Sequence, residues 1–260
     1  MRLFYFTSIL FSLTVLLSCN NGKINNDNGK NSNSEKIQAL KKYYYPFDEL
    51  ANDGLVYEYV DDSLGAVVDY WLFKTVKDEA GDRFLIGAGY NAMFEQRYFS
   101  REWIVANGTI LKDYRFIQTD SATKISKVRP AVIEESVIFP FDPVKDNSLA
   151  YRFRIKFNVL PDTAMNYDLV RDRKFDKFLE YDFNGKKIPA VQFKAKEYIE
   201  AKDSINGGNW TINSEMTEIY AEGIGLVYSE KKGKGVNFKN RLNKRMTPKE
   251  FESLQTTKNK

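Results

Sequence analysis

The sequence predicts a mainly β protein in which one long antiparallel meander forms a strongly curved sheet or an incomplete barrel, with a short helix at each end. Residues 151–159 alternate large apolar side chains with polar ones, the period of a strand that has one buried and one wet face. Turn sequences such as Asn184-Gly185 separate runs of this kind. Aromatic residues make up 15% of the 260 residues and gather in the predicted strands.

Residues 1–18 have the layout of a signal peptide. Arg2 supplies a positive charge, and an apolar stretch follows from Leu3 to Leu17. Fifteen helical residues would span about 22 Å, too short for a hydrocarbon core of ~30 Å, so the stretch is typical of an export signal and not of a membrane span.

The signal ends in Leu16-Leu17-Ser18-Cys19, and Cys19 is the single cysteine of the chain. This motif resembles the lipobox of bacterial lipoproteins, in which signal peptidase II cleaves before a cysteine whose thiol carries the lipid. The resemblance implies a mature chain anchored to a membrane by acyl chains on Cys19. Asn20, by the same resemblance, implies the outer membrane of a Gram-negative bacterium, with the protein on the periplasmic side.

Residues 19–36 then form a lipidated cysteine and a tether. Seven Asn and one apolar residue, Ile24, occur in residues 20–36, a composition that cannot bury a core.

Residues 37–245 are expected to form one antiparallel β domain. A short amphipathic helix is predicted over 37–45, before Pro46. Further turns are predicted at Asn107-Gly108, at residues 79–82 and at residues 206–208. Residues 161–173 break the alternation and predict a long loop or a short helix.

Residues 246–260 are expected to form a short basic C-terminal helix and tail. Thr247-Pro248-Lys249-Glu250 is a capping box with proline at the first helical position.

The composition excludes several kinds of chemistry. A chain with no histidine and one cysteine cannot build a Ser-His-Asp triad, a histidine zinc site or an internal disulfide. Gly87-Ala88-Gly89 is not followed by a third glycine, so no nucleotide loop is indicated. We therefore predict no catalytic residue, no cofactor and no metal site. Nucleic-acid binding is not expected of an exported lipoprotein.

The aromatic strands have two interpretations. The rings either fill a packed sheet core or line a concave face that takes an acyl chain or another apolar ligand. The layout of long strands with a late Gly223-Ile224-Gly225-Leu226-Val227 segment resembles the half-barrel envelope proteins of the LolA and LolB type, which implies a lipidic ligand.

The C-terminal region is basic. Residues 231–260 hold ten Lys or Arg against two Glu, while the whole chain is only +4. Such a region either contacts anionic head groups or is a solvated surface. The candidate contacts are Lys231, Lys232, Lys234, Lys239, Arg241, Lys244 and Arg245.

Asp followed by Ser or Thr and a small or apolar residue occurs four times. The pattern resembles the acceptor motif of a bacterial O-glycosylation system, and it is also ordinary turn chemistry. The candidate acceptors are Ser63, Ser121, Thr163 and Ser204.

These observations favour a non-enzymatic envelope lipoprotein that binds an apolar or lipidic ligand or a partner protein. The alternative is a structural or assembly subunit of an outer-membrane-associated complex, in which the aromatic face is simply packed. A more distant alternative is a carbohydrate-active enzyme, which needs two carboxyl groups converging across a cleft.

Overall fold

The computed structural model describes residues 39–119, 125–142, 150–158 and 164–258. No helix in these ranges has both the length and the apolar character needed to cross a membrane. The elements are the 3-10 turns η1 (Lys41–Tyr43) and η2 (Glu49–Ala51), the strands β1 (Leu55–Asp61), β2 (Val67–Lys77), β3 (Arg83–Asn91), β4 (Gln96–Val105), β5 (Gly108–Thr119), β6 (Ser126–Pro130), β7 (Val132–Pro140), β8 (Tyr151–Asn158), β9 (Met165–Phe183), β10 (Lys186–Asp203), β11 (Asn209–Ala221), β12 (Gly225–Gly233) and β13 (Val236–Met246), and the helix α2 (Pro248–Lys258).

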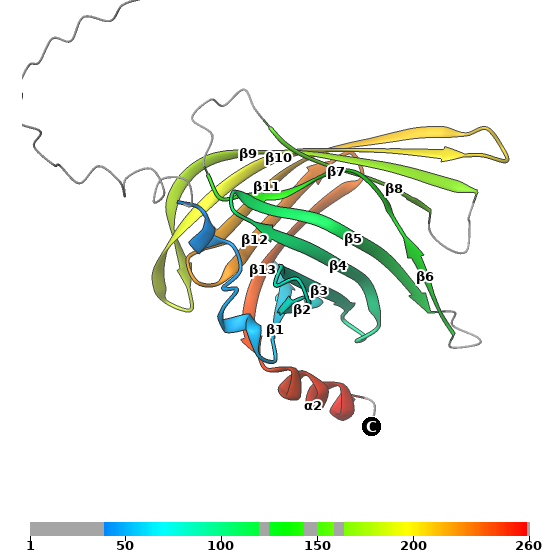
Figure 1. The fold of residues 1–260 in the computed structure, drawn as a ribbon. Helices are drawn as coiled ribbons and strands as arrows, with labels where there is room; N and C mark the ends of the chain where they lie inside the picture. Colours follow the sequence, from blue (N-terminus) through cyan, green and yellow to red (C-terminus); the bar gives the residue numbers. More distant parts are fainter. Residues whose placement is uncertain (1–38, 120–124, 143–149, 159–163, 259–260) are drawn as a thin grey trace, which may run out of the picture.

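The strands form one antiparallel sheet that curls into a barrel (Figure 1). The order is β4-β3-β2-β1-β13-β12-β11-β10-β9-β8-β7-β5, and β4 pairs with β5 to complete a ring of twelve strands in the described part of the chain. The predicted fold class, a strongly curved sheet or incomplete barrel, is confirmed.

The ring is weakest between β5 and β7. Within the described residues, these strands pair at Gly108↔Pro140, Thr109↔Phe139 and Ile110↔Val137. Beyond that point β5 pairs instead with β6, and β7 turns away to pair with β8. We call the short β5–β7 ladder the seam.

The two ends of the barrel differ. The chain from Leu40 to Leu50 packs into one end, which we call the closed end: the amide of Leu40 donates to Phe141 O at 2.9 Å, and the amide of Gly223 donates to Lys42 O at 2.9 Å. In Figure 1 this segment is blue and lies at the left of the barrel. The helix expected over 37–45 is reduced, among the described residues, to the single turn η1.

At the other end, the open end, no described segment of this kind enters the barrel. There β9, β10 and β11 extend past their neighbours (right of Figure 1).

Local sequence signals account for several elements. Asn184 and Gly185 have φ of 54° and 76°, the left-handed pair that the predicted turn requires, and they join β9 to β10 with Phe183 opposite Lys186. The capping box forms as predicted: the amide of Thr247 donates to Glu250 Oε2 at 2.6 Å, and the amide of Glu250 donates to Thr247 Oγ1 at 3.3 Å.

The prediction of a loop or short helix over 161–173 is wrong for its described part. Met165–Phe183 is a strand of 19 residues, paired along its length with β10. The alternation is hidden because Arg171 and Arg173, on the face turned to the barrel interior, are charged where a core strand would have apolar side chains.

The helix α2 covers the outer surface of the barrel. Phe251 is buried and packs against Tyr70, Tyr90 and Phe94, with ring centroids 5.0, 5.3 and 5.5 Å away. This contact forms a small core outside the ring, separate from the main core between the barrel wall and the closed-end segment.

Candidate functional site

The barrel encloses a cavity of about 450 Å³ between the closed-end segment and the open end. We call this space the lumen. Its size is in the range of small-molecule sites, which are about 300–1,000 Å³. The wall is not uniformly apolar: aromatic rings line one part, and a group of ionised side chains lines another.

Five aromatic residues form a belt on the lumen wall. The rings touch in sequence across β2, β4, β5 and β8, with centroid distances of 6.0, 6.4, 5.2 and 4.2 Å. Phe116 on β5 and Phe157 on β8 are stacked at 24°, so the belt passes from β5 to β8 inside the ring. The aromatic belt consists of Trp71, Tyr98, Tyr114, Phe116 and Phe157.

Two glycines on β3 make room for this belt. A Cβ on Gly89 would lie 2.9 Å from Trp71 Cζ2, and one on Gly87 would lie 3.2 Å from Phe73 Cε1. Trp71 therefore lies directly over the β3 backbone, and its ring is nearly parallel to those of Phe73 and Tyr98, at 11° and 2°. The Gly87-Ala88-Gly89 sequence, which is no nucleotide loop, is the surface on which this flat aromatic wall rests.

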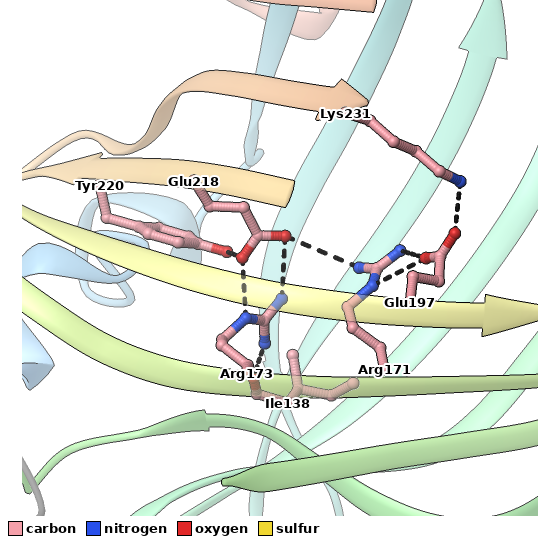
Figure 2. Close-up of polar contacts among 7 residues, drawn as sticks. All are labelled: Ile138, Arg171, Arg173, Glu197, Glu218, Tyr220 and Lys231. Atoms are coloured by element: carbon pink, nitrogen blue, oxygen red, sulfur yellow. Dashed lines mark hydrogen bonds and ion pairs between the residues drawn. The ribbon is translucent and has the colours of Figure 1, made fainter. Parts of the chain in front are cut away.

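Beside the belt lies a cluster of five charged side chains from four neighbouring strands (Figure 2). Its members alternate in sign, so each carboxylate contacts at least one cation. We call it the ion cluster: Arg171 and Arg173 on β9, Glu197 on β10, Glu218 on β11 and Lys231 on β12.

Arg173 and Glu218, two buried members of the cluster, form a pair joined by two hydrogen bonds. Arg173 donates to both oxygens of Glu218, at 2.7 Å from Nε and 3.1 Å from Nη2, and a third donor reaches Ile138 O. Tyr220 adds a hydroxyl bond to Glu218 Oε2 at 3.3 Å. Burial alone would raise the pKa of the Glu218 carboxyl, but Arg173 and Arg171 outweigh it and hold that pKa below its ordinary value.

The outer part of the cluster is centred on Glu197. Arg171 donates to Glu197 Oε2 at 3.0 Å from Nε and 2.6 Å from Nη2, and Lys231 contacts Oε1. The cations Arg171 and Lys231 outweigh burial and lower the pKa of Glu197. The third nitrogen of the guanidinium, Arg171 Nη1, lies 3.7 Å from Glu218 Oε1, beyond hydrogen-bond distance.

Two further carboxyl groups in the lumen have raised pKa values. Burial raises the pKa of Glu102 on β4 to about 7, although Tyr44 donates a hydroxyl bond of 2.9 Å to its Oε2. Burial raises the pKa of Asp69 on β2 to about 6, opposed by a hydrogen bond with Trp71. Asp69 Oδ1 is buried with no hydrogen-bond partner among the described residues.

The comparisons with known proteins concern the fold. No family model and no curated protein matches the chain. A Bacteroides fragilis protein, assigned as exported and described as having a YmcC-like fold, matches with a TM-score of 0.50 and 12% identity, over 78% of this chain and 99% of its own. The chain has a YmcC-like fold. Two weaker matches are a Parabacteroides distasonis protein assigned as a lipoprotein (TM-score 0.47, 12% identity, 78% of this chain and 98% of its own) and the hypothetical lipoprotein YmcC of Escherichia coli (TM-score 0.28, 11% identity, 76% and 89%).

The predicted basic contacts are spread around this YmcC-like barrel. Lys231 contacts Glu197 in the ion cluster, whereas Lys232 lies on the opposite face of β12 and Lys234 is exposed in the β12–β13 turn. Five of the predicted contact residues each have a carboxylate oxygen within 4.0 Å of a side-chain nitrogen. These ion pairs are Lys232–Glu230, Lys239–Glu230, Arg241–Asp62, Lys244–Glu58 and Arg245–Glu49.

Two of the four candidate glycosylation acceptors are described, and both are exposed in turns. Ser63 follows β1, and its amide donates to Asp61 Oδ1 at 2.9 Å. Ser204 follows β10, and its hydroxyl donates to Ala164 O at 2.9 Å. Cys19, Ser121 and Thr163 lie outside the described residues.

Sequence reasoning missed the ion cluster except for Lys231, which it assigned to the surface. A signal was present in β9: Leu169 and Phe175 occupy the same strand face as Arg171 and Arg173. Charges set between apolar residues on one strand face indicate buried ion pairs, provided that the segment is first recognised as a strand.

Proposed function

We propose that this protein is a lipid-anchored envelope protein, held at the periplasmic side of the outer membrane by acyl chains on Cys19. The support is the sequence: a signal of residues 1–18, a small residue before the single cysteine, and Asn20 after it. The Bacteroides fragilis protein that shares the fold is assigned as exported, which agrees with an envelope location.

The anchor has a direct test. Cys19→Ala should abolish the incorporation of labelled palmitate, because the thiol is the acceptor of the lipid. Ser18→Ala keeps a small residue before the cysteine and is the matched control, which should label as the wild type does. Labelling of Cys19→Ala would contradict the anchor.

We further propose that the YmcC-like barrel binds an amphipathic, lipidic ligand in its lumen and does not transform it. The cavity of about 450 Å³ lined by the aromatic belt is the observation that carries this proposal. A protein that served only as a scaffold would gain more stability from filling the space, because interiors are normally close-packed. The ion-cluster carboxylates, Glu197 and Glu218, are both engaged by cations, which favours binding over acid–base chemistry.

The binding proposal is tested on the full chain purified from its membranes into phosphatidylcholine nanodiscs. Native mass spectrometry of the wild type should show a bound lipid that empty nanodiscs do not supply. Trp71→Ala removes the centre of the aromatic wall and should reduce that occupancy about tenfold or more.

The matched control is Trp103→Ala. Trp103 lies on the outer face of β4 under Lys112, whose Nζ is 4.8 Å from its ring, so its loss should leave occupancy unchanged. A wild type without bound lipid, or equal occupancy in Trp71→Ala, would contradict lumen binding and favour the scaffold alternative.

A further inference from the structure

The ion cluster carries more positive than negative charge. Arg171, Arg173 and Lys231 supply three cations, whereas Glu197 and Glu218 supply two carboxylates. Both carboxylates have lowered pKa values and are ionised near neutral pH. Burying an uncompensated charge is costly, so buried cations usually have a matching anion.

The position of Arg171 decides where such an anion would bind. Arg173 is almost fully buried and its donors are engaged by Glu218 and Ile138 O, whereas 26% of the Arg171 side chain is exposed, and Arg171 lines the lumen. Its Nη1 makes no hydrogen bond to Glu218 at 3.7 Å. A planar guanidinium that lines a lumen and has a nitrogen beyond hydrogen-bond distance of the neighbouring carboxylate is a good partner for a carboxylate or a phosphate of a ligand.

We propose that the ligand in the lumen carries one anionic group, bound at Arg171 and balanced by Lys231, while its apolar part lies along the aromatic belt. This inference rests on the proposed function, because it assigns the chemistry of the ligand for the same cavity. Leu169 on β9 and Ile155 on β8 line the lumen next to Arg171 and lead to Phe157 of the belt. One ligand can therefore contact both Arg171 and the aromatic belt.

Other ionisable groups among the described residues of the lumen favour binding of the anion on the side of Arg171. Glu102 on β4 interacts with Arg173, and its burial-raised pKa of about 7 leaves it partly protonated at neutral pH. Asp69 on β2 owes its shifted pKa to burial and to Trp71, not to any member of the ion cluster. Where it is ionised it repels an anion from the opposite wall. Burial raises the pKa of Tyr44, Tyr114 and Tyr220, so these three tyrosines of the lumen add no negative charge.

The test compares three probes that share a twelve-carbon chain: dodecanoate, dodecyl phosphate and 1-dodecanol. Radiolabelled probes are equilibrated with the full chain in phosphatidylcholine nanodiscs, and empty nanodiscs supply the blank. The wild type should bind one of the two anions at least about tenfold more tightly than the alcohol. Preference for dodecanoate indicates a fatty acid, and preference for dodecyl phosphate indicates a phospholipid-like head group.

Arg171→Gln and Lys231→Gln each restore equal numbers of cations and carboxylates, so each should lose this preference. Arg152→Gln is the matched control: Arg152 forms the same kind of two-bond pair with Asp172, at 2.6 and 2.9 Å, but outside the lumen. It should keep the preference. Melting temperatures of all three variants show which are folded, and having two ion-cluster variants keeps the test valid if one of them does not fold.

Glu102→Gln gives an independent readout. Wild-type affinity for dodecanoate, which stays ionised in this range, should rise as pH falls from 8 to 6, because Glu102 and then Asp69 gain protons, and Glu102→Gln should weaken that dependence. Equal binding of the alcohol and both anions by the wild type overturns the anionic ligand but keeps the lipid-binding function. Failure of all three probes to bind overturns both.

Discussion

At the residue scale, the pair of Arg173 and Glu218 is the most demanding part of the interior. The exposed fractions of the two side chains are 7% and 5%, and two hydrogen bonds join them. Replacing Arg173 alone leaves a buried carboxylate without its main partner. We expect Arg173→Met to lower the free energy of unfolding by about 3–5 kcal/mol, measured by urea denaturation.

The double variant Arg173→Met/Glu218→Met separates the cost of an orphaned charge from the cost of lost packing. It should be more stable than Arg173→Met, because no unpaired carboxylate remains. Arg152→Gln breaks a partly exposed pair of similar geometry and should cost less than about 1 kcal/mol. Equal losses in Arg173→Met and in the double variant would show that the charge pair has no special role.

Glu102 gives a second prediction at this scale, concerning pH. Its pKa rises from 4.5 to about 7 on folding, mainly through burial, so the folded state binds more protons than the unfolded state between these values. Stability contributed by this group is then lost as pH rises through that window, at most about 3 kcal/mol. Glu102→Gln keeps an acceptor for Tyr44 without the charge.

Urea denaturation of both proteins at pH 4.5, 6 and 8 measures the effect. The difference in unfolding free energy between Glu102→Gln and the wild type should increase in favour of the variant from pH 4.5 to pH 8. Using the difference removes the contribution of groups such as Glu197 and Glu218, whose lowered pKa values act in the opposite direction. A difference that is constant with pH would contradict the shift.

Arg171 and Arg173 show why the site is harder to predict from the sequence than the fold. Apolar alternation identifies β8, since its inward face is Tyr, Phe, Ile and Phe. In β9 the inward face contains Arg171 and Arg173, whose partners are 26 and 45 residues away in the sequence. A charge paired at that separation looks like a solvated charge until strand pairing is known.

At the scale of the element, local signals gave correct predictions. The Asn184-Gly185 turn and the Thr247–Glu250 capping box depend on neighbours in the sequence, and both form. The segment 37–45 has a helical pattern but its side chains face three different partners: Tyr43 lies near Phe178, Tyr44 near Phe139 and Tyr45 near Phe73. Tertiary packing overrides the local preference there.

The helix α2 supplies a prediction of its own. Phe251 is its buried anchor against Tyr70, Tyr90 and Phe94, so Phe251→Ala should destabilise the protein by about 3 kcal/mol or more in urea. Glu250→Ala removes half of the capping box and should destabilise the protein less than Phe251→Ala does. Glu252→Ala changes an exposed residue of the same helix and should have little effect. A Phe251 variant as stable as Glu252→Ala would mean that α2 does not support the barrel.

At the scale of the whole molecule, the sequence predicts curvature but not where the ring closes. Closure depends on the β4–β5 pair, which the predicted Asn107-Gly108 turn joins as a hairpin, and on the short seam between β5 and β7, which has no local signal. In the described part of the chain, β9 and β10 pair at eighteen positions, whereas β5 and β7 pair at three positions in the seam. Opening of the ring should therefore begin at the seam, because local stability follows local contacts.

Tyr44, in the closed-end segment, joins β7 on one side of the seam to β4, the strand that pairs with β5 on the other side. Its ring stacks on Phe139 of β7 at 4.4 Å and 25°, and its hydroxyl donates to Glu102 of β4 at 2.9 Å. Tyr43, its neighbour, instead faces Phe178 of β9, with centroids 6.0 Å apart. One tyrosine of the same segment thus bridges the seam, and the other does not.

Amide hydrogen exchange under native conditions tests this arrangement. We expect the wild-type amides of Thr109, Ile110 and Phe139 to exchange faster than those in the middle of the β9–β10 pair. Tyr44→Ala should accelerate exchange at the seam much more than at β9–β10, because it removes the contact that holds β7 to β4. Tyr43→Ala removes a similar buried area from the same segment and should not act selectively at the seam. Uniform acceleration across the barrel by Tyr44→Ala would show that the ring opens as one unit, and the seam would then not be the site where it first separates.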